Sequence, residues 1–108
     1  MTKPCVLRPL ATQDKRSELR YYRREAGGAV ANKLLDALEK TLVDLRLNPA
    51  IGSPTLGHML DVTGLGTWRI NGFPLSFWYF ERDTHVDIAR LVGQRQDADA
   101  VDVSTSTR

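Results

Sequence analysis

The clearest hydrophobic pattern in the chain is helical and runs from residue 29 to residue 47. Apolar residues recur there at spacings of four, four, four and three: Val30, Leu34, Leu38, Leu42 and Leu45. Residues at these spacings share one face of a helix. The pattern therefore predicts a helix with an apolar stripe that a sheet must cover, ending at Asn48-Pro49.

A shorter helical segment precedes it. Thr12 is a candidate N-cap, Asp14 suits the positive end of the helix dipole, and the helix is expected to run to about Ala26. Gly27-Gly28 would end it, since glycine adopts left-handed C-cap geometry without strain. With two glycines between them, the two helices are expected to form an antiparallel hairpin.

The stretch 67–95 changes to a strand pattern and holds six of the eight aromatic residues with four arginines. Asn71-Gly72 and the polar run 81–84 divide it into three antiparallel strands. A short strand at 5–10 is predicted at a sheet edge or ending at Arg8, because Pro9 lacks a ladder donor. The fold class is α+β: an N-terminal strand and an antiparallel helical hairpin packed on a small antiparallel β-sheet.

The remaining segments lack a sustained period. Residues 50–66 contain four glycines and one proline, and we expect a connecting loop there with about one turn of structure. We place one domain at 1–97. The polar tail 98–108 is predicted to be partly disordered, beginning at most as a short helix.

Strand alternation sorts the side chains of 67–95 onto two faces, given a two-residue turn at Asn71-Gly72 and a second loop closed by Arg82 and His85. The first face, assigned to the helices, holds Trp68, Ile70, Phe73, Leu75, Phe77, Tyr79, Val86, Ile88 and Val92, with Arg90 as its only cation. The second face holds Arg69, Ser76, Trp78, Phe80, Arg82, His85, Asp87, Ala89 and Leu91. A second loop of odd length would exchange the faces of the last strand.

The second face mixes large rings with charge, and two interpretations remain open. A small domain rarely exposes such a patch without a partner, and Trp and Arg are frequent in binding hot spots. Alternatively, the loop 50–66 or the C-terminal tail folds over Trp78 and Phe80. The first interpretation predicts a binding surface and the second a further part of the core.

The net charge, the apolar runs and the cysteine count limit the kinds of partner, location and cofactor that we expect. Fifteen basic and thirteen acidic residues give a net charge of +2, short of what gripping nucleic acid through phosphates requires. A protein partner fits better, without sequence-specific nucleic-acid binding. No apolar run could span a membrane and no signal peptide precedes the first strand, so a cytoplasmic location is expected. The lone Cys5 excludes an internal disulfide, and no cofactor is expected.

Catalytic chemistry has few candidates. His58 and His85 lie in or beside loops and are not spaced for a metal, so neither a metal site nor a catalytic residue is predicted. Arg69, Arg82 and Arg95 could stabilise a phosphorane in RNA cleavage. The base is missing, however, because Glu81 falls on the first face and Asp87 would need a strongly raised pKa.

Four segments together give a family resemblance. They are the opening VLRPLATQD with Tyr21-Tyr22 and 25–27, the helix exit NPAIGSP at 48–54, the segment WRINGFP at 68–74, and the closing strand IARLVGQR at 88–95. In this order they resemble the ParE branch of the RelE/ParE superfamily, toxins of bacterial type II toxin–antitoxin pairs, over about residues 5–97.

The resemblance implies a helical hairpin on a small sheet and a ParD-like antitoxin whose flexible C-terminal segment folds along the toxin. ParE-like toxins trap DNA gyrase on cleaved DNA, whereas RelE-like relatives cut messenger RNA in the ribosome. Arg69 and Arg95 match two basic positions of the ribosome-dependent branch. Asn71 replaces its lysine, Pro74-Leu75 stands where an arginine is expected, and Val101 lies near its aromatic position.

These departures favour the gyrase branch, although Val92 replaces a histidine common in ParE-like chains. A RelE-like endonuclease and a non-toxic antitoxin-binding module remain the alternatives. The candidates for target binding and toxicity are Arg69, Trp78, Arg82, Arg90 and Arg95. The candidates for antitoxin binding are Arg16, Arg20, Arg23, Phe80 and Leu91.

Overall fold

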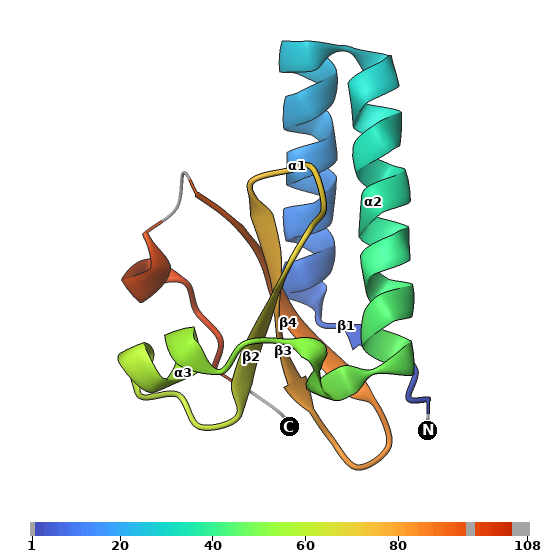
Figure 1. Cartoon of the computed structure of the whole chain (residues 1–108). Helices are drawn as coiled ribbons and strands as arrows, with labels where there is room; N and C mark the ends of the chain where they lie inside the picture. The colour runs from blue at the N-terminus through green and yellow to red at the C-terminus, as the bar shows by residue number, and fades with distance from the viewer. Residues whose placement is uncertain (1, 95–96, 105–108) are drawn as a thin grey trace.

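The computed structural model describes residues 2–94 and 97–104. Its elements in chain order are β1 (Cys5–Leu7), α1 (Pro9–Ala26), α2 (Gly28–Leu47), the 3₁₀ helix η1 (Pro49–Ile51), α3 (Thr55–Leu60), β2 (Leu65–Arg69), β3 (Leu75–Glu81), β4 (Val86–Gly93) and the 3₁₀ helix η2 (Ala98–Ala100). The predicted α+β class is confirmed. The two long helices form the antiparallel hairpin on one side of the sheet, and its closed end extends past the sheet (Figure 1).

The sheet has the strand order β1-β4-β3-β2. β2, β3 and β4 are antiparallel, as predicted. β1 lies at the edge and pairs in parallel with β4, from Cys5 beside Val86 to Leu7 beside Ile88, so the sheet is mixed rather than antiparallel. A parallel neighbour needs a crossover connection, and the helical hairpin supplies it.

The start of α1 differs from the prediction. The N-cap is Arg8 in an extended conformation, and Pro9 occupies the first turn, so Thr12 is not the cap. Proline suits this position because its fixed φ matches the helix and its missing N–H would have no helical partner. At the other end Gly27 has φ 93°, and its N–H donates to the Arg23 carbonyl. The predicted glycine stop is confirmed, and α2 begins directly at Gly28.

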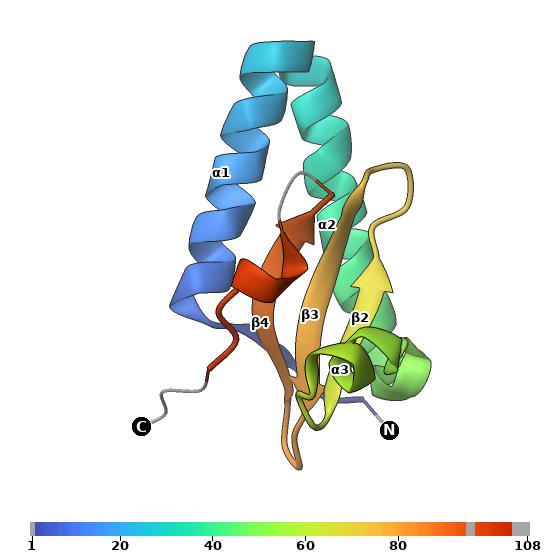
Figure 2. The ribbon, with the colours of Figure 1, turned by 90° about the vertical axis from the view of Figure 1, so that its left-hand side faces the viewer.

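The main core lies between the helical hairpin and the first face of the sheet. The apolar stripe of α2 contributes Leu34, Leu38 and Leu45, each fully buried. They pack with Phe77 and Ile88 and further side chains of the same face in one cluster. Figure 2 shows both helices behind the sheet, with α3 and the C-terminal segment in front of it.

The first hairpin has a longer turn than predicted. Trp68 lies opposite Phe77, and the Ile70 N–H donates to the Leu75 carbonyl, which leaves a four-residue connection. This register differs by two residues from a two-residue turn. Because side chains alternate with a period of two, the predicted faces of β2 and β3 are retained. Phe73, in the connection, packs edge-on against Tyr22 of α1.

The second hairpin begins in the predicted register, with Glu81 opposite Val86 and Tyr79 opposite Ile88. The register then shifts, and Trp78 lies opposite Arg90. Ala89 is thus the extra residue of a bulge, and beyond it the faces of β4 exchange.

Three predictions on β4 are therefore wrong. Leu91 pairs with Phe77 and belongs to the main core, whereas Val92 pairs with Ser76 and belongs to a second apolar cluster on the opposite face. Arg90 lies opposite Trp78 instead of on the first face. The bulge is the cause of all three reversals, because one inserted residue inverts the alternation of everything after it.

The loop before β2 holds more structure than predicted. It contains η1 and the six-residue helix α3, and β2 starts at Leu65, two residues earlier than expected. Ser53 pairs with Thr67 through two backbone hydrogen bonds of 2.9 and 3.0 Å. This pairing protects the middle of the outer edge of β2 and brings the loop back over the sheet.

Candidate binding surface

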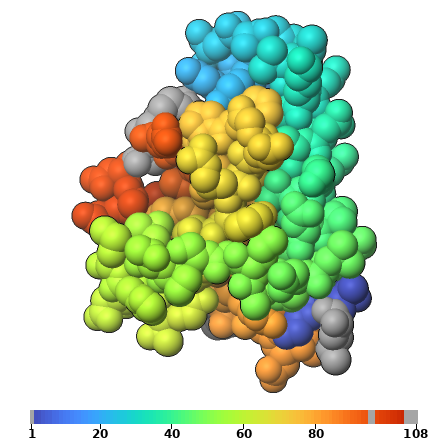
Figure 3. Space-filling view, in the orientation of Figure 1, coloured from blue at the N-terminus to red at the C-terminus, as the bar shows by residue number. Residues whose placement is uncertain are grey.

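The second face of the sheet is covered from both sides. Trp78 and Phe80 are only 3% and 7% exposed, in a cluster with Leu65, Ala89 and Val92. The cover comes from Leu56, Leu60 and Val62 around α3 and from Ala98, Val101 and Val103 near the C-terminus. The expected open aromatic patch is therefore wrong, and the alternative, in which the loop and the tail fold over it, is correct. Figure 3 shows α3 and the C-terminal segment side by side on this part of the molecule.

Two arginines share one aspartate at the lower end of the second face. Arg8 donates two hydrogen bonds of 2.9 Å to the two carboxylate oxygens of Asp87. Arg82 donates two more, of 3.2 and 2.9 Å, to Oδ2. Both guanidinium groups also lie over the Phe80 ring, 5.4 and 4.8 Å from its centroid. The two cations are thus fixed by a carboxylate and an aromatic face at once.

The environment of Asp87 decides its chemistry. Burial would raise its pKa, but the hydrogen bonds and charges of Arg8 and Arg82 outweigh burial and lower the pKa below its usual value. An ionised carboxylate held by two guanidinium groups is a weak base. Asp87 therefore positions the arginines and does not meet the requirement for a raised pKa.

A second ion pair ties β4 to α1. Arg90 donates hydrogen bonds of 2.7 and 2.9 Å to the carboxylate of Asp14, whose Oδ2 also accepts from the Leu91 N–H at 3.0 Å. The hydrogen bonds that Arg90 donates to Asp14 raise the pKa of Arg90. Asp14 thus bonds β4 of the sheet and not the first turn of its own helix. This differs from the prediction, which placed Asp14 in the first turn after an N-cap at Thr12.

The tail segment, residues 97–104, is held by the same arginines. Arg90 donates to the Asp102 carbonyl at 3.1 Å. Arg8 donates to the carbonyls of Val103 and Ser104 at 3.1 and 3.2 Å. The predicted partly disordered tail begins with the turn η2 and packs on the sheet up to Ser104, while residues 105–108 lie outside the described residues.

Among the described arginines predicted to bind the target, Arg69 is the most exposed. Its exposed side chain borders a groove of about 230 Å³ together with Ser76, Trp78 and Ala98. Arg82 is 40% exposed but engaged by Asp87, and Arg90 is largely buried against Asp14. Arg95 lies outside the described residues. The structure therefore does not gather the four candidates that it describes, Arg69, Trp78, Arg82 and Arg90, into one exposed patch.

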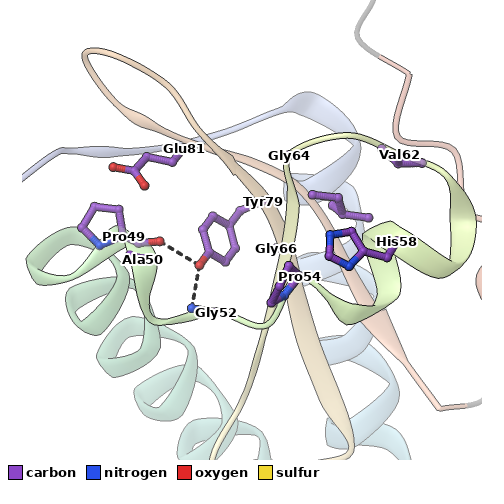
Figure 4. Close-up of a pocket in the computed structure, with 11 residues that line it drawn as sticks. Pro49, Ala50, Gly52, Pro54, His58, Val62, Gly64, Gly66, Tyr79 and Glu81 are labelled. Atoms are coloured by element: carbon purple, nitrogen blue, oxygen red, sulfur yellow. Dashed lines mark hydrogen bonds between the residues drawn. The ribbon is translucent and has the colours of Figure 1, made fainter.

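A pocket of about 400 Å³ lies at the end of the sheet away from Arg69, between η1, α3 and β3 (Figure 4). The Tyr79 hydroxyl donates to the Pro49 carbonyl at 2.8 Å and accepts from the Gly52 N–H at 2.9 Å. A Cβ atom at Gly52 would collide with this hydroxyl. Burial raises the pKa of Tyr79. Tyr79 therefore pins the connecting loop to the sheet.

The other titratable groups near this pocket are engaged or exposed. Glu81 forms a 3.0 Å ion pair with Lys3, and His58 is exposed on α3. His85 lies 3.1 Å from the Thr84 hydroxyl in the last hairpin. The two histidines therefore lie on separate elements, His58 on α3 and His85 in the last hairpin.

The antitoxin-binding candidates fall into three environments. Arg16, Arg20 and Arg23 are exposed on α1. Phe80 lies beneath Arg8, Arg82 and the tail segment, and Leu91 belongs to the main core. Only the three arginines remain directly accessible to a partner.

Sequence reasoning missed Arg8, Asp14 and Asp87 as an electrostatic framework for the second face. Asp87 alternates with apolar residues and shares the side of Phe80, and Arg8 follows β1 directly. The parallel pairing of β1 with β4, which brings Arg8 to Asp87, had no signal in the local sequence.

Across residues 2–94 and 97–104, no group of three metal-ligating side chains is close enough to hold an ion. None of the helices in this part of the chain is long and apolar enough to cross a membrane. The Cys5 thiol donates a hydrogen bond to the Leu42 carbonyl, and burial raises the pKa of that thiol.

Comparison with known proteins decides the family. A family model described as the ParE toxin of the type II toxin–antitoxin system parDE matches residues 6–98. The chain belongs to the ParE toxin family. None of the curated proteins compared with it matches.

The fold of this ParE-family chain is shared by a solved structure titled "Chromosomal ParDE TA system from P. aeruginosa". The two are 18% identical, the likeness covers 85% of this chain and 96% of the other, and the TM-score is 0.72. The family match ends at residue 98, so the contacts of Val101–Ser104 with the second face lie beyond it.

Proposed function

We propose that this ParE-family chain is a toxin that inhibits DNA gyrase in the cytoplasm and is neutralised by a ParD-like antitoxin. The observation that carries the proposal is the family match over residues 6–98. The likeness of the fold to a chain of a ParDE system supports the antitoxin partner.

The geometry supports a binding mechanism without catalysis by the toxin. The two carboxylates considered as candidate bases are already engaged: Asp87 by Arg8 and Arg82, and Glu81 by Lys3. RNA cleavage would need a free base beside a cationic cluster. A toxin that stabilises a gyrase–DNA complex needs only a complementary surface.

Arg69 is the residue we propose to contact gyrase first. It is exposed beside a groove that Trp78 helps to line, and a planar guanidinium at the centre of an interface is a frequent hot spot. Losing such a contact costs about 2 kcal/mol of binding free energy, about thirtyfold in affinity. Arg82 and Arg90 stabilise the second face through their ion pairs with Asp87 and Asp14, respectively.

For the antitoxin, we propose that acidic side chains meet the exposed arginines of α1, Arg16, Arg20 and Arg23. Complementary charges of this kind accelerate association and make it sensitive to salt. The antitoxin gene is expected in the neighbouring reading frame, encoding a short ribbon-helix-helix protein.

Induction of the chain in bacteria without its antitoxin tests the proposal. Wild-type protein should arrest growth, produce filamentous cells and accumulate gyrase-linked DNA breaks. Arg69→Ala should weaken all three while still being neutralised through the antitoxin. The triple variant R16A/R20A/R23A is the matched control, and it should remain toxic but escape neutralisation.

Other outcomes would identify the alternatives. Normal DNA topology with cleaved ribosome-bound messenger RNA would replace the proposal with a RelE-like endonuclease. Unchanged growth together with intact antitoxin binding would leave only a non-toxic binding module.

A further inference from the structure

The tail segment contacts the second face through its backbone, as a peptide ligand would. Three successive carbonyl groups, those of Asp102, Val103 and Ser104, accept hydrogen bonds from Arg90 and Arg8. Hydrogen bonds to main-chain carbonyls do not depend on which side chains the peptide carries. The two arginines therefore bind backbone carbonyls, and this peptide site could hold other sequences.

The peptide site is formed independently of the tail. Arg8 is fixed by Asp87 and Arg90 by Asp14, through hydrogen bonds of 2.7 to 2.9 Å that do not involve residues 97–104. The guanidinium groups would keep their positions if the tail left. Preorganisation of this kind lowers the cost of binding a replacement peptide.

The tail fills the peptide site only in part. Val101 and Val103 are partly buried against the second cluster, with the exposed Asp102 between them. Beside them a groove of about 530 Å³ remains, lined by Val62, Thr63, Phe80 and Arg82 as well as by residues 101–104. The tail is also joined to the sheet by no strand pairing among the described residues, since β1 to β4 pair only with one another and with Ser53.

We propose that this site binds an extended segment of the antitoxin with the pattern apolar–acidic–apolar, which takes the place of Val101–Ser104. The proposal rests on the proposed function only for the existence of the antitoxin. The pattern follows from the two apolar positions that Val101 and Val103 fill and from the acidic residue between them, Asp102, whose carbonyl accepts a hydrogen bond from the guanidinium group of Arg90. The tail then competes with the partner, and the fraction of chains with a released tail sets the apparent affinity.

The first test unseats the tail in the full-length chain. In the variant V101S/V103S the two apolar contacts are lost without a change in charge. We expect the antitoxin from the neighbouring reading frame to bind this variant about tenfold more tightly than wild type, because the competitor is weakened. Ala100→Ser, at an exposed position of the same segment, is the matched control and should leave affinity unchanged.

A synthetic peptide with the sequence of residues 98–104, ADAVDVS, provides a probe that does not require the antitoxin. It should bind V101S/V103S at least about tenfold more tightly than the wild-type chain, whose site is occupied. The same peptide with serine at both valine positions should not bind. Equal binding of ADAVDVS to both chains, or none to the variant, would overturn the peptide site.

A distance measurement in the wild-type background avoids the unseating variant. Spin labels at Ala100→Cys and Met59→Cys, with Cys5→Ser, report the separation of the tail from α3. Addition of the antitoxin should lengthen and broaden the distance distribution. If the antitoxin binds but changes neither the distance nor, in V101S/V103S, its own affinity, the proposed displacement of the tail is wrong and the proposed function stands. If the antitoxin does not bind at all, the proposed partner is wrong. In that case the binding of the ADAVDVS peptide still decides whether the peptide site exists.

Discussion

The two faces of the sheet are covered in different ways. The first face meets two long helices whose apolar stripe is continuous, and its central side chains Phe77, Ile88 and Leu38 are fully buried. The second face meets the six-residue helix α3 and the tail segment. Its cover depends on a few apolar side chains and on hydrogen bonds from Arg8 and Arg90 to carbonyl groups.

This difference separates stability from binding. A cover of long helices buries much apolar area per ordered residue and opens only when the whole domain unfolds. A cover of short segments opens locally at a small cost, since few contacts are lost. The first face is therefore the core of the fold, and the second is the face on which exchange of partners is physically accessible.

The largest expected effect is on the first face. Phe77→Ala should lower the free energy of unfolding by about 3–5 kcal/mol, because a fully buried ring leaves a cavity between α2 and the sheet. Phe80→Ala should cost less, because the short segments over it can move into the space. Urea denaturation of both variants measures the difference, and equal losses would contradict the contrast between the faces.

The next effect concerns the electrostatic framework of the second face. Asp87→Asn should destabilise the protein by about 2 kcal/mol at neutral pH, since Arg8 and Arg82 lose their ionised partner. The folded-state pKa of Asp87 is lowered, so its contribution is fully present above the unfolded pKa of about 3.9 and is lost as pH falls through the lower folded value.

Unfolding curves of wild type and Asp87→Asn should therefore differ at pH 7 and converge below about pH 4. Lys3→Ala, which removes the more exposed ion pair with Glu81, is the control and should change stability by less than about 1 kcal/mol. A constant difference between wild type and Asp87→Asn down to pH 2 would show that the ion pairs are not its cause.

The sequence predicted the local features of the fold but not the contacts between distant segments, such as the ion pairs of Asp87. The period of α2, the stops at Gly27 and Asn48, and the alternation in β2 and β3 are local properties, so both helices and the first-face core were predictable. No glycine or proline near Ala89 indicates the bulge there, and the bulge places Leu91 and Val92 on the faces opposite to those predicted. Val101 and Val103 alternate with polar residues, a weak strand-like signal that the polar composition of the tail obscured.

A smaller effect is expected at the loop between the two faces. Tyr79→Phe removes the hydrogen bonds to Pro49 and Gly52 and should cost about 1 kcal/mol. Because this ring lies on the first face while its hydroxyl fixes the loop leading to α3, the variant should also loosen the cover of the second face. Faster hydrogen exchange in α3, with α2 unchanged, would show this coupling, and unchanged exchange in α3 would exclude it.

The smallest effect on stability is expected at Arg69. Arg69→Ala should change the free energy of unfolding by less than about 0.5 kcal/mol, because the side chain is exposed. It should nevertheless reduce gyrase inhibition about thirtyfold. A variant that stays stable and fully inhibitory would remove Arg69 from the target surface.

Native-state hydrogen exchange on the free, full-length chain tests the contrast between the two faces most directly. The tail amides of Ala100 and Val101 are hydrogen bonded to the carbonyls of Asp97 and Ala98 and can be compared with amides in the middle of α2. Local opening of the tail predicts protection of these two amides at least about a hundredfold lower than in α2 and independent of low denaturant concentrations. Equal protection of the two segments, with the same dependence on denaturant, would show that the tail opens only with the whole domain and would contradict the account.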